Sequence, residues 1–360
     1  MLPKPLRLTT AAMLVTVAAA AGCSSIGPRT VARDRFDYSS AVSRSWKEQT
    51  LLNIVKLRYL DLPVFLDVGQ IVAGYTLEEG ASLGGTISSK GAVQGDLINM
   101  GLTGRFTDRP TITYTPVTGD RFLRGMLEPI PPASVFFLLQ SGYAADFMLS
   151  LTTESLCGLR NRPAGIGTDR QADPAFLRTI ALLRELQASG GFGMRVEPAE
   201  KGPAATVLFF RGEDLDPELV AKIQEVKSLL RLPEKSSRFR LVFSPVRGAE
   251  TEVAVQTRSL IQVLSGLGSY VEIPELDRTE TRAAPMAAFP TGDDLPFHVK
   301  CSSSQPDDAY VAVPYRGSWF SIDDRDWRSK RAFGLVMFLF SLVGGGPPEQ
   351  LPLLTISSGG

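Results

Sequence analysis

Glycine recurs throughout residues 64–117, and this segment is the strongest constraint on how the chain can fold. Apolar and polar residues alternate at its two ends, over residues 64–68 and 111–115, as they do in half-buried strands. Glycine inside a helix costs about 1 kcal/mol relative to alanine, so the segment favours hairpins, bulges or a mobile loop. The glycines near its centre are Gly80, Gly84, Gly85, Gly91, Gly95, Gly101 and Gly104.

The same segment holds few large apolar residues near its centre. A two-stranded hairpin is only marginally stable in water by itself, and its unpaired edges are templates for other strands. We therefore expect residues 64–117 to meet a protein partner or another copy of this chain. The alternative is a mobile surface loop that needs no partner.

The rest of the chain alternates between predicted helices and strands, which indicates an α+β fold. Residues 37–60 predict a helix that Pro63 ends, and the second half of this helix is apolar on nearly every side, so we expect it to be buried. Two apolar runs, over residues 135–139 and 147–151, are too short to span a bilayer and predict core helices.

Residues 161–250 predict an αββα unit. Asp173 and Asp216 each precede a proline, which is the pattern of a helix N-cap followed by proline in the first turn. Apolar residues then follow with i, i+4, i+7 spacing in both helices. Two strands are predicted between the helices, over residues 193–197 and 206–211.

Residues 251–360 predict a second α/β unit with a related order of elements. The predicted helices cover residues 257–267 and 324–343, and the predicted strands cover residues 270–273, 309–315 and 318–322. The first helix and the Gly-rich strands form a third predicted domain, residues 37–160.

Charge and composition exclude several classes of function. Lys+Arg and Asp+Glu both number 38, so the chain lacks the basic excess that is typical of nucleic-acid-binding proteins, and no nucleic acid is expected as a partner. The single histidine, His298, excludes His-rich zinc sites. No phosphate-binding glycine motif and no metal-ligand motif occurs. We therefore expect no cofactor and no metal site.

The first 22 residues resemble the signal peptide of bacterial lipoproteins. A basic start with Lys4 and Arg7 precedes an apolar stretch over residues 11–21. Residues 20–23, Ala-Ala-Gly-Cys, are similar to the lipobox of that family, in which the cysteine thiol takes a diacylglyceryl group. The alternative is an ordinary secretory signal that happens to end near a cysteine.

The resemblance implies that mature Cys23 carries acyl chains and anchors the protein to a membrane, because several chains together give a durable anchor. Ser24 follows the cysteine, and in Gram-negative lipoproteins that pattern implies sorting to the outer membrane. Residues 23–36 are polar and are expected to be a tether, with the body in the periplasm. Without Lys4 and Arg7 the chain keeps 36 basic and 38 acidic side chains, a net charge of −2.

Two cysteines remain in the body, Cys157 and Cys301. An oxidising compartment permits a disulfide between them. The alternative is that each is a small buried thiol.

Several residues are candidates for catalysis, and each has a simpler interpretation. Residues 80–84 match the G-x-S-x-G motif, with Ser82 as nucleophile and His298 as base, but that motif needs a helix directly after the serine, and the next residues predict turn and strand. Cys301 and His298 could form a catalytic pair, but three-residue spacing puts them on opposite faces of a strand.

Carboxylates and aromatic residues near the C-terminus are open to two interpretations. Asp323, Asp324 and Asp326 could bind a cation or act as acid and base, or they could occupy a helix start and pair with neighbouring cations. Four aromatic residues could line a ligand groove or pack against one another across strands; they are Tyr310, Tyr315, Trp319 and Phe320.

Together these features predict a non-enzymatic outer-membrane lipoprotein that serves as a scaffold, an assembly factor or a subunit of an envelope complex. Small αββα units of this order are similar to the ring-building domains of envelope secretion machines. One alternative is a lipid-anchored hydrolase of envelope material, which would act through Ser82 with His298 or through the carboxylates of residues 323–326. Another is a carrier of lipid or of a small ligand.

Overall fold

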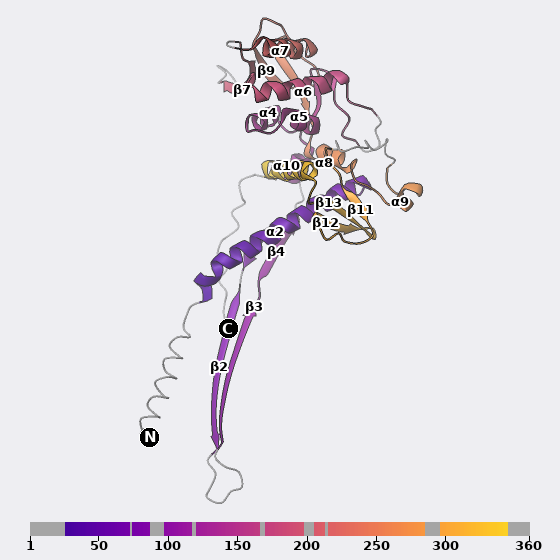
Figure 1. Ribbon diagram of the computed structural model, residues 1–360. Coiled ribbons are helices and arrows are strands. Elements are labelled where there is room, and N and C mark those ends of the chain that lie inside the picture. The colour runs from indigo at the N-terminus through magenta and orange to yellow at the C-terminus, as the bar shows by residue number, and fades with distance from the viewer. Residues whose placement is uncertain are drawn as a thin grey trace, which may run out of the picture. The chain divides into compact units, whose positions relative to one another are not determined.

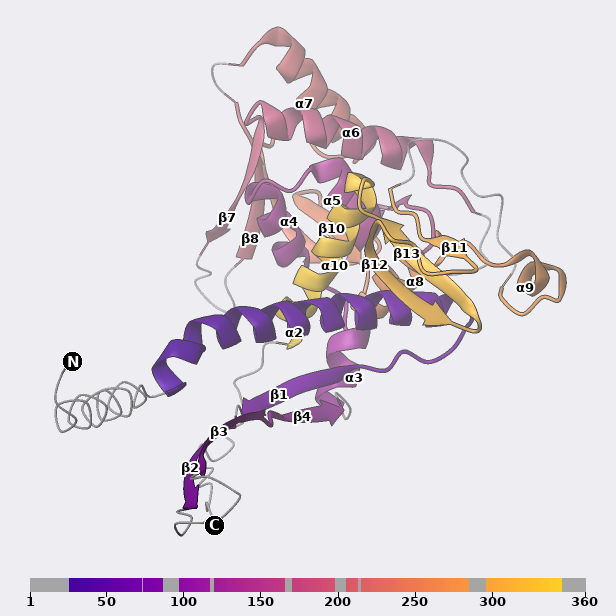
Figure 2. The same ribbon diagram turned by 60° about the horizontal axis from the view of Figure 1, so that its bottom comes forward.

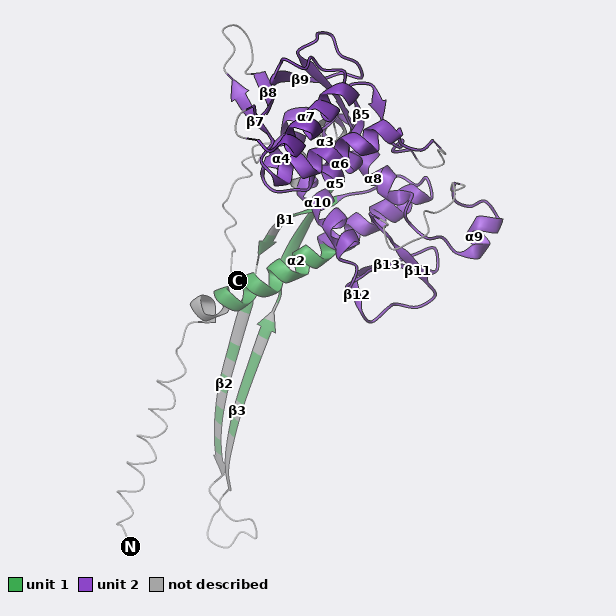
Figure 3. Cartoon of the chain, turned by 45° about the horizontal axis from the view of Figure 1, so that its top comes forward, with its two compact units in different colours: residues 1–45, 66–116 green, residues 46–65, 117–360 purple. Residues whose placement is uncertain are grey.

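The computed structural model divides into two compact units (Figure 3). Unit 1 consists of residues 1–45 and 66–116, and unit 2 consists of residues 46–65 and 117–360. Helix α2 (Ile26–Arg58) contributes its first part to unit 1 and its last part to unit 2. The structure describes residues 26–72, 74–86, 97–116, 120–165, 170–197, 205–212, 215–284 and 296–344.

The strands of unit 1 form one long antiparallel hairpin (Figure 1). The pairs are β1 (Leu66–Val72) with β4 (Thr111–Pro116), and β2 (Tyr75–Thr86) with β3 (Leu97–Asp108). One register continues from the first pair into the second, and between them the Arg109 amide donates to the Gly74 carbonyl over 2.9 Å. The strands predicted at both ends of residues 64–117 are thus confirmed, and the glycine-rich centre extends the ladder.

A six-stranded sheet forms the larger part of unit 2. From one edge to the other it contains β6 (Leu159–Arg160), β5 (Thr153–Leu156), β10 (Glu252–Thr257), β9 (Arg238–Phe243), β8 (Ala205–Phe210) and β7 (Phe192–Glu197). Only β9 and β10 are parallel among these pairs. The sheet crosses both predicted domain boundaries, 160/161 and 250/251, because β5 pairs with β10 although about a hundred residues separate them. The division into residues 37–160, 161–250 and 251–360 therefore differs from the compact units that the structure has.

Four helices accompany this sheet (Figure 2): α4 (Pro132–Gln140), α5 (Ala145–Thr152), α6 (Pro174–Ala188) and α7 (Pro217–Leu229). The order α6-β7-β8-α7 confirms the predicted αββα arrangement. Asp173 is the N-cap residue of α6, as expected, but its carboxylate accepts a hydrogen bond from the Arg160 amide over 2.7 Å rather than from its own helix. Arg178 pairs with Glu225 at 2.7 Å and links α6 to α7.

A second, three-stranded sheet has the order β11 (Lys300–Ser302), β13 (Ser318–Asp323) and β12 (Ala309–Tyr315). The remaining helices of unit 2 are α3 (Asp120–Leu127), α8 (Leu260–Gly268), α9 (Glu275–Thr279) and α10 (Trp327–Gly344). Ser259 caps α8 in a reciprocal capping box with Gln262. The strand predicted over residues 270–273 is reduced to a single bridge between Val271 and Val299.

The hydrophobic core belongs to unit 2. The second half of α2 is buried as predicted, with Leu51, Ile54 and Val55 fully inaccessible to solvent. Helix α10 is also largely buried, through residues such as Phe333 and Val336. None of the helices in the described part of the chain is both long enough and apolar enough to cross a membrane.

The predicted fold class, α+β with an N-terminal helix and a Gly-rich hairpin followed by an αββα unit, is confirmed. Helix α2 begins at Ile26, so residues 26–36 of the expected tether, residues 23–36, are helical. Proline is tolerated near a helix start, so Gly27 and Pro28 do not prevent helix there.

Candidate functional site

Unit 1 has apolar surface, and the part of it whose exposure the structure describes forms no core. None of its residues whose exposure the structure describes is buried, and every residue of the hydrophobic core belongs to unit 2. Large apolar side chains are instead exposed: Phe36 is 73% exposed, Val31 63% and Tyr114 57%. Large apolar side chains that are exposed in this way are candidates for contact with a partner. Unit 1 is therefore the candidate functional site.

The hairpin also presents unpaired backbone. In the described part of the chain β2 pairs only with β3, and β1 only with β4, so each strand has one outer edge without a strand partner. Twelve residue pairs make up the β2–β3 ladder. A long strand edge of this kind is a template for pairing with another strand, and main-chain hydrogen bonds to an added strand are a common mode of recognition.

On one face of this hairpin, two side-chain hydroxyls lie directly against the backbone of the opposite strand. The hydroxyl of Thr103 donates to the Gly80 carbonyl over 3.2 Å, and the hydroxyl of Ser82 lies 3.5 Å from the Gly101 carbonyl that accepts from it. A Cβ atom on Gly80 or Gly101 would come within 2.6 Å of these hydroxyl oxygens. Glycine at these two positions therefore allows the hydroxyls to lie directly over the ladder.

Ser82 is not placed as a hydrolase nucleophile. It lies in the middle of β2, is exposed, and has strand residues on both sides rather than a helix after it. It belongs to unit 1, whereas His298 belongs to unit 2. The G-x-S-x-G match is thus part of a glycine-rich strand.

His298 is part of a hydrogen-bond network around one carboxylate. Its Nε2 lies 2.6 Å from Oε1 of Glu272, and Oε2 of Glu272 accepts the backbone N–H of Cys301 over 3.0 Å. The hydrogen bond with His298 holds the pKa of Glu272 below its usual value. Burial raises the pKa of the Cys301 thiol, which disfavours the thiolate that a nucleophile needs. The network therefore connects Glu272 to β11 and to the segment before it. It contains no activated nucleophile.

The three C-terminal aspartates each have a local partner. Asp323 pairs with Lys300 at 2.8 Å, and Asp324 pairs with Lys330 at 2.7 Å. Asp326 accepts the hydroxyl of Ser329 over 2.6 Å near the start of α10. Within the described residues, no group of His, Cys, Asp and Glu side chains is arranged to hold a metal ion.

The body cysteines are free thiols. Cys157 lies at the turn between β5 and β6 of the six-stranded sheet, and Cys301 lies on β11 of the other sheet. The disulfide considered from the sequence is therefore not formed in the structure. Burial raises the pKa of Cys157 as well, so both fit the alternative of small, protected thiols. The predicted lipidation site, Cys23, lies outside the described residues.

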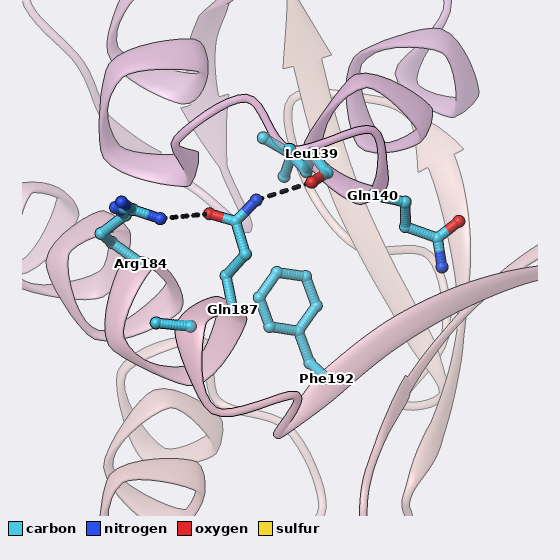
Figure 4. Close-up of a pocket in the computed structure, with 7 residues that line it drawn as sticks. Leu139, Gln140, Arg184, Gln187 and Phe192 are labelled. Atoms are coloured by element: carbon cyan, nitrogen blue, oxygen red, sulfur yellow. Dashed lines mark hydrogen bonds between the residues drawn. The ribbon is translucent and has the colours of Figure 1, made fainter.

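A pocket of about 430 Å³ lies between α4, α6 and β7 (Figure 4). Gln187 crosses its wall and donates to the carbonyls of Leu139 and Tyr143 over 2.6 and 2.7 Å, while its Oε1 accepts the amide of Ala145 over 3.0 Å. Gln140 donates to the Met194 carbonyl over 2.8 Å. The lining contains no carboxylate, thiol or imidazole. Gln187 holds the backbone of the α4–α5 connection, and Gln140 joins α4 to β7.

The aromatic residues of the second sheet pack against other aromatic side chains. Tyr315 and Phe320 both lie edge-on to Tyr59, with ring centroids 5.5 and 6.3 Å away. Tyr310 meets Phe333 in the same manner at 6.3 Å. Such pairs stabilise a fold, and they agree with the packing interpretation rather than with a ligand groove.

Two sets of buried polar interactions could not be predicted from the sequence. Arg258 is 5% exposed, and its guanidinium donates to the Glu154 carboxylate over 3.1 Å and to the carbonyls of Ser150 and Leu151 over 3.2 and 3.1 Å. The Tyr59 hydroxyl donates to the buried carboxylate of Asp277 over 2.7 Å, and burial raises the pKa of Tyr59. Neither position carries a sequence motif, because the partners are distant along the chain.

No family model, no curated protein and no solved structure matches this chain. The function is therefore inferred from the fold and from the surface of unit 1. They define an α+β protein in which the described buried polar groups belong to unit 2 and the two longest strands form a two-stranded ladder in unit 1.

Proposed function

We propose that this chain is an outer-membrane-anchored lipoprotein with its body in the periplasm, where it acts without catalysis as a structural subunit or assembly factor of an envelope complex. The anchor is Cys23, and the association element is the hairpin of residues 66–116. The observation that supports this proposal most strongly is that no residue of unit 1 whose exposure the structure describes is buried, while Phe36, Val31 and Tyr114 are exposed.

The candidate catalytic groups give an enzyme little support. Ser82 has no helix after it, the imidazole of His298 is committed to Glu272, and the acidic residues near α10 have cationic or hydroxyl partners. An activated nucleophile requires a base within hydrogen-bond reach. The hydroxyl of Ser82 donates to a backbone carbonyl rather than to a base. Asp326 does accept the hydroxyl of Ser329, but Ser329 is fully inaccessible to solvent. Strand edges and exposed apolar side chains, by contrast, meet the conditions for assembly.

The experiment compares tagged variants in a host envelope. One variant replaces residues 75–108 by Asn-Gly, a second is Cys23→Ser, and a third combines Ser82→Ala with His298→Ala. The wild type should fractionate with the outer membrane and migrate as a large complex on native gels. The shortened hairpin should keep the membrane fraction and lose the complex, and Cys23→Ser should lose the membrane fraction. The double variant should keep both; a complex that survives the shortened hairpin would refute the proposal.

A further inference from the structure

The register of β2 and β3 sorts their residues onto two chemically different faces. Residues directly opposite each other in an antiparallel ladder share a face, and successive pairs alternate between faces. One face is apolar in sequence over most of its length. Its apolar pairs are Leu77 with Phe106, Ala81 with Leu102, Leu83 with Met100, and Gly85 with Ile98, and the same face also holds Tyr75 with Asp108 and Glu79 with Gly104.

The other face of the same ladder is polar and small. Glu78, Gly80, Ser82 and Arg105 on this face are all exposed. Glu78 lies directly opposite Arg105, and opposite charges at facing positions stabilise a strand pair. The full set of opposed pairs on this face is Thr76 with Thr107, Glu78 with Arg105, Gly80 with Thr103, Ser82 with Gly101, and Gly84 with Asn99.

The dimensions of the apolar face match a lipid bilayer. From the pair at residue 77 to the pair at residue 85, the apolar face extends over eight residues, or about 27 Å at 3.4 Å per residue. Membrane-spanning strands carry an outward apolar band about 25 Å tall, with polar residues at the alternate positions. The period of two and the length of the band both agree with that pattern.

The base of the hairpin contacts α2 at a point that only a short length of chain separates from the predicted anchor. The hydroxyl of Tyr75, the first residue of β2, donates to the Asp34 carboxylate on α2 over 2.5 Å. Asp34 is about 12 Å along the helix from its start at Ile26, at 1.5 Å per residue. Cys23 is three residues earlier, at most about 11 Å of chain. A hairpin about 37 Å long, at 3.4 Å per residue over β2, therefore reaches the bilayer that holds Cys23.

We propose that the β2–β3 hairpin inserts into the bilayer to which Cys23 anchors the chain, with the apolar face toward the acyl chains and the face of Glu78 and Arg105 toward water. This inference rests on the proposed function, because the anchor brings the hairpin to the membrane. Lipid offers no partner for a strand edge, so the edge of β3 in one copy pairs with the edge of β2 in the next. The same contact repeats from copy to copy, and a ring of copies leaves no edge unpaired.

Glu79 is the exception on the apolar face, where it lies opposite Gly104. A charged residue on the lipid side costs least near the headgroups and most at the bilayer centre. Glu79 is two residues from Leu77 at one end of the band, which puts it near the headgroups. Glu79→Leu should therefore increase the fraction of hairpins that insert.

The experiment uses full-length lipidated protein in vesicles of phosphatidylethanolamine and phosphatidylglycerol at a ratio of 3:1. The two body cysteines are replaced by serine, and one cysteine carries an environment-sensitive NBD dye on β3. Dye at Met100 or Leu102 should shift to shorter emission wavelength and be quenched by nitroxide-labelled acyl chains. Dye at Asn99 or Thr103, on the polar face, should do neither. Uniform quenching at all four positions, or none at any of them, would overturn the proposal.

Matched substitutions separate insertion from folding and from anchoring. Leu102→Asp should abolish lipid quenching of dye at Met100, whereas Thr103→Asp should leave it intact, and the melting temperature of the body should be the same in both. Vesicle flotation is measured in parallel. If the protein floats but the dye is not quenched, insertion is refuted while the anchor stands. A protein partner that covers the apolar face would give this result. Protein that does not float overturns the membrane anchor and with it the proposed function.

Discussion

Replacing residues 75–108 by Asn-Gly should leave the stability of the body unchanged or slightly increased. Gly74 and Arg109 are already joined by a 2.9 Å backbone hydrogen bond, and Asn-Gly is the preferred two-residue turn for such a pair. No residue of the deleted stretch whose exposure is described is buried. The connection between Phe65 and Val117 falls from 51 to 19 residues, and at about 0.6 kcal/mol per doubling of loop length the gain is about 0.9 kcal/mol.

Phe65→Ala is the matched control at the edge of the same connection. Phe65 is 5% exposed and its ring centroid lies 4.9 Å from that of Phe340. Truncation of a buried phenylalanine costs about 3–5 kcal/mol, which lowers the melting temperature by roughly 6–20 °C in a domain of this size. Thermal unfolding of the unlipidated chains by circular dichroism measures both variants. A shortened hairpin that lowers the melting temperature as much as Phe65→Ala would refute the conclusion that unit 1 contributes nothing to the core.

Three further predictions follow from the body and the anchor. Arg258→Met should destabilise the body by about 3–5 kcal/mol in urea titrations, because it removes the nearer of the two cations beside the Glu154 carboxylate and leaves several carbonyls unpaired; a loss below about 1 kcal/mol would contradict this interpretation. The hydrogen bond with His298 lowers the pKa of Glu272 in the folded protein below the ordinary value of 4.5. The ionised Glu272 therefore contributes fully to stability above pH 4.5, and this contribution is lost as the pH falls through the pKa of the folded state. Glu272→Gln should therefore show a smaller fall in urea midpoint than the wild type between about pH 5 and pH 3, and equal falls would contradict the assignment. Mass spectrometry of the mature N-terminus should find acyl mass on Cys23 and an unprocessed precursor in Cys23→Ser; a mature N-terminus elsewhere would exclude lipidation.

Local signals in the sequence were sufficient to predict the αββα unit and the hairpin. Asp173 and Asp216 before proline mark the starts of α6 and α7 because proline fits the first turn of a helix. The scarcity of large apolar residues near Gly80 predicted a segment without its own core, which agrees with the exposure of unit 1. Both inferences depend on residues close together in the chain.

Long-range pairing could not be predicted in the same manner. The contact of β5 with β10 joins segments about a hundred residues apart, and nothing in either strand identifies the other. The partnership of His298 with Glu272 is equally hidden, because Glu272 stands in no motif. The spacing of His298 and Cys301 did predict that their side chains would not form a catalytic pair, and the structure joins them only through Glu272.

The most direct test of the account is cross-linking between copies of the hairpin. Two populations are co-expressed, one with a single cysteine at Arg105 on β3 and the other with a single cysteine at Glu78, Ser82 or Gly84 on β2, with the body thiols replaced by serine. A Cβ atom on Gly84 would have no atom within 4 Å other than those of its chain neighbours. We expect disulfide-linked dimers, with the highest yield at one of the three β2 positions, because strands of neighbouring copies pair in a single register. A cysteine at exposed Val220 on α7 is the control and should give none. Absence of dimers at all three β2 positions, or equal dimers with the control, would contradict association through the hairpin.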